Sequence, residues 1–181
     1  MNNISMHILD IVQNSIRGKA TLIEIIINEN ILNNILEIKI KDNGTGMDQE
    51  MLNQVEDPYT TSRTTRKVGM GLPLLKHSAE QANGFLKVNS ELGIGTQVQA
   101  TFKHDHFDRP PLGDIAGTVV LLVAANPEID FKYIHHVNDK NYEFNTQEVK
   151  EILGDIKISD PKIRGFLKEM IVDNLNELYV V

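Results

Sequence analysis

The apolar and polar positions of the first hundred residues follow helical and extended periods in turn. Between Ser5 and Arg17 the apolar residues recur three and four positions apart, which predicts an amphipathic helix. Over 35–42 apolar and polar residues alternate, which predicts a strand, and the β-rich stretch 21–28 predicts a second strand. The asparagine-rich segment between these strands is typical of a hairpin turn. The other elements predicted in this half are a helix over 48–55, a polar loop over 57–68, a helix from Leu72 to Ala82, and strands over 85–90 and 96–102.

A linker with two consecutive prolines separates this half from the rest of the chain. The linker covers 104–113, and proline-rich polar segments of this kind are typical of connections between domains. We therefore place a boundary near residue 105 and expect two domains, at 1–104 and 105–181. The first is long enough for a core of its own, and the second would be a small companion.

The second half carries a different series of predicted elements. Strands are predicted over 117–125, 131–137 and 142–144. Helices are expected after Asn145 and Asp160, because both residue types cap helix N-termini, and Pro161 suits the first position of a helix. The predicted fold class is α+β, a two-layer α/β sandwich followed by a small α+β module.

Composition excludes several classes of function. No apolar run approaches the roughly 20 residues that span a bilayer, and the first residues do not form a signal peptide, so we expect a cytoplasmic protein without a membrane partner. The absence of cysteine excludes disulfides, thiolate metal sites and a cysteine nucleophile. A net charge of -7 disfavours a nucleic-acid partner, since phosphate neutralisation needs a basic surface. The sequence predicts no oligomeric state.

The first predicted helix carries two residues suited to phosphate chemistry. Asp10 and Asn14 are four positions apart, so both project from the same face of the helix. The amide oxygen of Asn14 is a neutral ligand suited to Mg²⁺, which proteins usually hold through one or two oxygens together with substrate phosphates. Asp10 could orient or deprotonate an attacking group. Taken alone, both residues would more often be solvated helix residues.

Three glycine-containing segments complete the chemical pattern. Asp42, at the end of a predicted strand and followed by Asn-Gly-Thr-Gly-Met, can accept a hydrogen bond from an exocyclic amine such as that of adenine. The segment from Gly69 to Leu72 precedes a helix, where free N–H groups favour phosphate. The turn before Thr96 could bring the Thr96 hydroxyl close to the same carboxylate. Each segment is weak evidence alone, and their order along the chain makes them significant.

These four segments resemble, in order, the N, G1, G2 and G3 boxes of the GHKL ATPase superfamily, whose domain has the Bergerat fold. The resemblance covers roughly residues 5–102 and implies ATP and Mg²⁺ as cofactors. It also implies that Asp42 reads adenine, that Asn14 holds the metal, and that Gly69 and Gly71 close a lid over the nucleotide. The segment 60–63 resembles the lid upstream of G2. The expected site residues are Asp10 for catalysis, Asn14 for metal, and Asn14, Arg17, Asp42, Gly44, Gly46, Met47, Arg63, Lys67, Gly69, Met70, Gly71, Leu72 and Thr96 for the nucleotide.

Departures from the family pattern indicate which branch the chain is similar to. In the mismatch-repair and anti-sigma branches a glutamate general base stands where this chain has Asp10, which is one methylene shorter. Arg17 resembles the basic residue that sensor histidine kinases place against the phosphates, which favours the kinase-like side. Only a few residues precede the N box, so we expect no dimerisation and phosphoacceptor helices there. A phosphoacceptor would then lie on another protein or on the tail.

The expected function is a stand-alone kinase-like regulator that acts on a partner protein. Two alternatives stay open: a slow ATPase switch of the mismatch-repair or gyrase kind, and a non-enzymatic ATP-binding module that sequesters a regulatory partner. The histidine pairs His104 with His106 and His135 with His136 could be metal pairs or phosphoacceptors, but are more typical of surface or strand residues.

Overall fold

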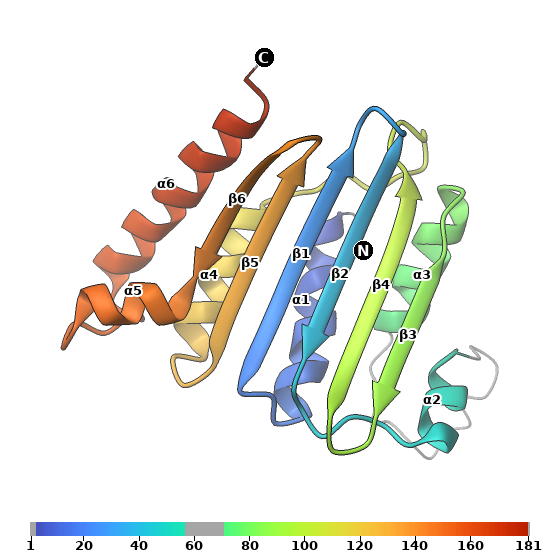
Figure 1. The fold of residues 1–181 in the computed structure, drawn as a ribbon, viewed down its shortest axis with the longest axis horizontal. Helices are drawn as coiled ribbons and strands as arrows, with labels where there is room; N and C mark the ends of the chain where they lie inside the picture. Colours follow the sequence, from blue (N-terminus) through green and yellow to red (C-terminus); the bar gives the residue numbers. More distant parts are fainter. Residues whose placement is uncertain (1–2, 57–70, 181) are drawn as a thin grey trace.

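The computed structural model describes residues 3–56 and 71–180. Within them, a six-stranded sheet has the order β3-β4-β2-β1-β5-β6, and α1, α3 and α4 lie behind it (Figure 1). The elements are α1 (Ile4–Arg17), β1 (Leu22–Asn30), β2 (Ile35–Asp42), α2 (Gln49–Glu56), α3 (Gly71–Gln81), β3 (Leu86–Glu91), β4 (Gly95–Lys103), α4 (Ile115–Ala125), β5 (Asp130–Val137), β6 (Lys140–Asn145), α5 (Thr146–Leu153) and α6 (Pro161–Leu178). This arrangement confirms the predicted mixed α/β sandwich of the Bergerat type.

Strand pairing joins the two halves of the chain into one sheet. β1 pairs antiparallel with β2, β2 with β4, and β4 with β3. β5 pairs parallel with β1, and a parallel neighbour requires a crossover, which the linker and α4 provide. β6 then returns antiparallel beside β5. The second half therefore extends the sheet of the first, while the division into two domains near residue 105 stays a prediction.

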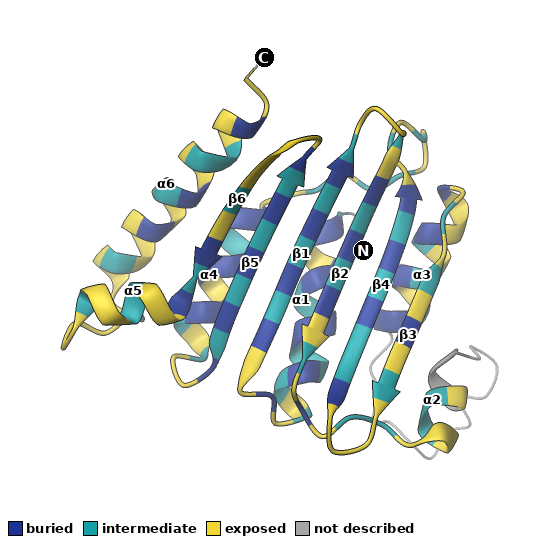
Figure 2. Ribbon diagram, in the orientation of Figure 1, coloured by how far each residue is buried: buried dark blue, intermediate teal, exposed yellow. Residues whose placement is uncertain are grey.

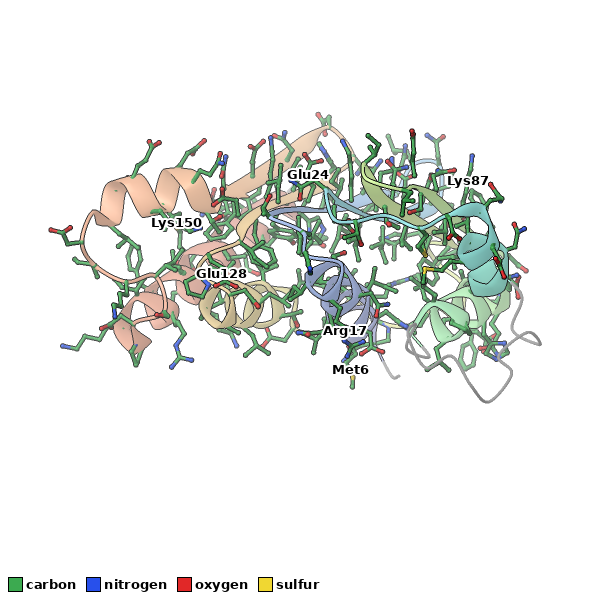
Figure 3. All side chains as sticks on the ribbon, turned by 90° about the horizontal axis from the view of Figure 1, so that it is seen from below. Met6, Arg17, Glu24, Lys87, Glu128 and Lys150 are labelled. Atoms are coloured by element: carbon green, nitrogen blue, oxygen red, sulfur yellow. The ribbon has the colours of Figure 1, made fainter. Side chains whose placement is uncertain are left out.

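The core lies between the sheet and the helices behind it. Buried and partly exposed positions alternate along β1, with Ile23, Ile25 and Ile27 buried (Figure 2). The opposite face of the sheet carries charged side chains such as Glu24 and Lys87, whereas Arg17 lies on the helical side (Figure 3). One-sided burial therefore explains the period of two that the sequence shows.

The segment 117–125, predicted to be a strand, is part of helix α4. Ile115, Val119 and Leu122 are among its buried residues, and the helix is almost entirely apolar. A helix packed on several sides shows no amphipathic period, so its apolar run is indistinguishable from that of a buried strand. The decisive signal is Asp114, whose carboxylate accepts a 2.8 Å hydrogen bond from the N–H of Gly117 and caps the helix.

A buried carboxylate ties the C-terminus to the sheet. Glu29 on β1 is 4% exposed, and its Oε1 accepts hydrogen bonds from His135 Nε2, at 2.8 Å, and from the Tyr179 hydroxyl. Its Oε2 accepts one from His104 Nε2 at 3.0 Å, and the Tyr133 hydroxyl contacts His135 Nδ1 at 2.7 Å. Burial raises the pKa of Glu29, but the hydrogen bonds from His135, Tyr179 and His104 outweigh it and hold that pKa at about 2. These two histidines are thus partners of a structural anion.

Two kinds of feature are absent from the described part of the chain. No group of three or more His, Cys, Asp or Glu side chains in it could hold a metal ion. None of its helices combines the length and the apolar character needed to cross a membrane.

Candidate nucleotide site

A cavity of about 600 Å³ opens between the C-terminal half of α1 and the ends of β2 and β4. Ile11, Ile40 and Val98 give it an apolar wall, and Asp42 and Thr96 contribute polar groups. A largely apolar cleft of this volume with a few convergent polar groups is typical of a small-molecule site. Among the predicted nucleotide residues, Asn14, Arg17, Gly46, Met47 and Leu72 also line it.

Asp42 is held by donors from three directions. Its Oδ1 accepts hydrogen bonds from the N–H of Gly44 at 2.9 Å and of Thr96 at 3.3 Å. Its Oδ2 accepts one from the hydroxyl of Ser15 at 2.6 Å. Sheet pairing fixes the backbone of Asp42 as well, because it lies between Ile23 and Thr96 in register. The carboxylate is therefore pre-oriented, and each oxygen retains acceptor capacity only in a restricted direction.

The Thr96 hydroxyl takes a different partner from the one expected. It contacts the hydroxyl of Ser90 at 2.8 Å, so Thr96 reaches Asp42 through its backbone N–H. Ser90 also donates to the carbonyl of Gly95 at 3.0 Å and accepts from the N–H of Met47 at 2.9 Å. One serine on β3 thus connects the turn before β4 to the loop after β2.

The conformation of the loop after β2 requires glycine at position 46. Its φ of +64° lies in the left-handed region, and a Cβ there would come within 1.9 Å of the carbonyl oxygen of Glu91. A side chain at this position would both strain the backbone and push the loop away from β3. Close packing here keeps Met47 at the cavity wall.

Asn14 and Arg17 form the second polar part of the cavity. The Arg17 guanidinium donates a 3.2 Å hydrogen bond to Oδ1 of Asn14. Arg17 is exposed and Asn14 half-buried. Asn14 lines the cavity, and its amide oxygen is a neutral ligand of the kind that suits Mg²⁺.

Asp10 lies beside the cavity, next to the start of α3. A Cβ placed on Gly71 would be 3.0 Å from both Cβ and Oδ2 of Asp10, so glycine lets this helix start approach the carboxylate. Asp10 is half-buried and does not itself line the cavity. The N-terminal turn of a helix carries free N–H groups that favour anions, and the Asp10 carboxylate lies against this turn.

Four predicted nucleotide residues lie outside the described residues. They are Arg63, Lys67, Gly69 and Met70, and the expected lid segment 60–63 lies outside as well. Their proposed contacts stay predictions.

Ser15 and Lys19 are among the cavity residues that were not predicted from the sequence. Ser15 is 5% exposed and occupies the apolar stripe of α1 that includes Ile8, Ile11 and Val12. A lone serine on a buried helical stripe needs a partner, so its position was a usable signal. Lys19 also lines the cavity, with a φ of +58° that no sequence pattern indicates.

Comparison with known families identifies this domain. Residues 3–106 match the family described as "Histidine kinase-, DNA gyrase B-, and HSP90-like ATPase". The chain belongs to this ATPase family. The match contains α1 to β4, and therefore every described residue predicted for the nucleotide. Membership of this GHKL family supports ATP binding.

Relatives of this chain within the family include sensor kinases. The chain is 36% identical to the sensor histidine kinase YvrG of Bacillus subtilis over 90 residues, 48% of this chain and 15% of that protein. It is 30% identical to sporulation kinase D of the same organism over 100 residues, 55% of this chain and 20% of that protein. The chain therefore spans a fifth or less of these relatives. A crystal structure of the N-terminal domain of a DNA repair protein shares the fold, with 18% identity and a TM-score of 0.56 over 80% of this chain and 52% of that one.

Proposed function

We propose that this chain binds ATP with Mg²⁺ in the cavity beside α1 and acts as a kinase-like regulator on a partner protein that docks against residues 105–181. The observation that carries the nucleotide assignment is the geometry of Asp42. Its carboxylate faces a cavity of nucleotide size and is fixed by Ser15, Gly44 and Thr96. Family membership supports the same ligand.

The chemistry of Asp42 favours adenine over guanine. A carboxylate accepts hydrogen bonds, and adenine presents an amino group where guanine presents a carbonyl oxygen. Guanine would therefore set two acceptors against each other in a cavity with apolar walls, which is unfavourable because neither finds a donor. We expect selectivity for ATP over GTP.

The roles of the remaining residues follow from their positions. Asn14 would supply one oxygen to Mg²⁺, which neutralises phosphate charge, and Arg17 would release Asn14 and turn to the phosphates. Asp10, beside the start of α3, would accept the proton of an attacking hydroxyl or water. Similarity to sensor kinases supports the kinase-like role.

Calorimetric titration of ATP and GTP into the purified chain, with and without Mg²⁺, tests the nucleotide assignment. We expect magnesium-dependent binding of ATP, weak binding of GTP, and loss of ATP binding in Asp42→Ala. Equal affinity for both nucleotides, or unchanged binding in Asp42→Ala, would contradict the role of Asp42.

A second experiment separates the kinase-like function from its alternatives. With radiolabelled γ-phosphate, transfer to a co-purified protein supports the kinase-like regulator, and release of free phosphate without a partner supports a slow ATPase switch. Asp10 in the position of a water-activating base favours that switch as the runner-up. Binding with neither transfer nor release would leave a non-enzymatic module that sequesters its partner.

A further inference from the structure

Helix α1 ends in a turn in which glycine is the most common residue. The N–H of Lys19 donates to the carbonyl of Ile16 at 3.0 Å, and the N–H of Ala20 donates to the carbonyl of Ser15 at 3.1 Å. This pair of bonds closes a helix with one residue in the left-handed conformation, most often glycine. Here that residue is Lys19, with a φ of +58°, although Gly18 stands immediately before it with a φ of -73°.

Helix α3 ends in the same turn with a residue that suits it. The N–H of Asn83 donates to the carbonyl of Glu80 at 3.1 Å, and that of Gly84 to the carbonyl of Ala79 at 2.8 Å. Asn83 has a φ of +56°, and asparagine tolerates this conformation better than other side chains. The other non-glycine residues with positive φ in the described part of the chain are Asn34 and Asn138. Lys19 is therefore the one residue of these four that is not an asparagine.

The position of Lys19 offers a reason for the exception. Lys19 lines the cavity, and Gly18 before it accepts a 2.7 Å hydrogen bond from the N–H of Thr45, in the loop that follows Asp42. Lys19 thus lies at the end of the cavity where Asp42 is held. Among the described residues, the charged ones that line the cavity are Lys19, Arg17 and Asp42, so the lining has a net positive charge in a chain of net charge -7.

Arg17 already provides the positive charge that the C-terminal end of helix α1 favours. Lysine or arginine near a helix C-terminus stabilises the helix dipole, but Arg17 in the last turn of α1 provides that charge. The dipole does not require a left-handed lysine. Unfavourable backbone conformations retained beside a binding cavity are a recognised sign of function.

The geometry points to Lys19 as a nucleotide-binding residue whose ammonium contacts the adenosine part of ATP. An ammonium group donates hydrogen bonds, and adenosine offers ring nitrogens and ribose oxygens as acceptors at the end of the cavity where Asp42 lies. This inference rests on the proposed ATP site. It assigns to Lys19 a recognition role that is independent of phosphate charge.

Substitutions at the two matching helix ends test it. Lys19→Asn keeps a side chain suited to the left-handed turn and removes the ammonium, Lys19→Arg keeps the charge, and Asn83→Lys places lysine at the equivalent position outside the cavity. We expect Lys19→Asn to raise the melting temperature by about 2–4 °C. The same variant should lower the affinity for both ATP and adenosine about tenfold, because one hydrogen bond to a charged group is lost. Lys19→Arg should retain most of the affinity. Asn83→Lys should lower the melting temperature and leave nucleotide binding unchanged.

Failure of this inference is distinguishable from failure of the proposed function. If the unmodified chain binds ATP and Lys19→Asn binds adenosine equally well, the role of Lys19 is wrong and the ATP site stands. Loss of affinity for ATP but not for adenosine would place the ammonium on the phosphates and would also overturn the inference. Absence of ATP binding by the unmodified chain would overturn both.

Discussion

The hydroxyl of Ser15 on α1 donates a hydrogen bond of 2.6 Å to Oδ2 of Asp42 at the end of β2. It links the helix that carries Asn14 to the carboxylate expected to read the base. Since Gly44 and Thr96 occupy the other oxygen, Ser15 determines which direction of Oδ2 stays available to a ligand. The helix and the sheet thus position the acceptor together.

Ser15→Ala should therefore weaken ATP binding without abolishing it. The carboxylate would lose one charge-assisted hydrogen bond, worth about 1.5–3 kcal/mol, and some of its fixed orientation. We expect ATP affinity measured by calorimetry to fall about tenfold. Ser78→Ala is the matched control, because Ser78 lies on α3 and contacts His7 instead of Asp42. Equal effects of the two variants would mean that Ser15 acts only through stability.

Asp10 and Asn14 should separate catalysis from binding. Asn14→Ala removes the oxygen expected to hold Mg²⁺, so we expect the magnesium-dependent part of the ATP affinity to disappear. Asp10→Asn retains the size of the side chain and removes its basicity, so binding should be unchanged and any turnover lost. Calorimetry and phosphate release measure the two effects. Turnover in Asp10→Asn at the rate of the unmodified chain would show that Asp10 is not the base.

The strands of the first half were predictable because each buries only one face. Ile38 and Ile40 alternate with charged residues on β2, and a period of two is a local signal. α4 was not predictable in the same way, since its apolar residues face several neighbours. Nor does any local pattern indicate that β5 pairs with β1, because that pairing joins positions more than a hundred residues apart.

Within the site, the sequence predicted the residue types better than their contacts. Asp42 and Thr96 were expected to meet, and they do, but through the backbone N–H of Thr96. The hydroxyl is taken by Ser90, a residue on an edge strand with no distinctive pattern around it. The conformation of Lys19 was likewise not predictable from the sequence, because its φ depends on how α1 joins β1.

Two glycines with positive φ should respond differently to alanine. At Gly46 a Cβ would lie 1.9 Å from the carbonyl oxygen of Glu91, whereas at Gly93, with a φ of +80°, it would meet nothing within 4 Å. Gly93→Ala should therefore lower the free energy of unfolding by only about 1–2 kcal/mol, which is the cost of the left-handed conformation. Gly46→Ala should lower the free energy of unfolding, measured by thermal unfolding, more than twice as much, and should weaken ATP binding. Similar losses would contradict the close packing of this loop.

Glu29 should make folding stability sensitive to acid. Its pKa of about 2 in the folded chain lies below the ordinary value of 4.5, so the folded state binds fewer protons than the unfolded state between these values. The contribution is fully present above pH 4.5 and is lost as the pH falls toward 2. It amounts to roughly 3 kcal/mol, from about 1.4 kcal/mol for each unit of pKa difference. Urea unfolding between pH 7 and pH 2.5 measures it.

Glu29→Gln should remove that dependence on pH. The neutral amide keeps the volume, but it cannot accept charge-assisted hydrogen bonds from His104, His135 and Tyr179, so the variant should be less stable at pH 7. The difference from the unmodified chain should shrink as the pH falls below 4.5, because Glu29 then gains a proton in the unfolded state, which removes the stability that its folded-state charge provides. Glu143→Gln is the control: it breaks an exposed ion pair with Lys132, and such pairs contribute little. A constant difference at all pH values would show that Glu29 stabilises the fold by packing and not by charge.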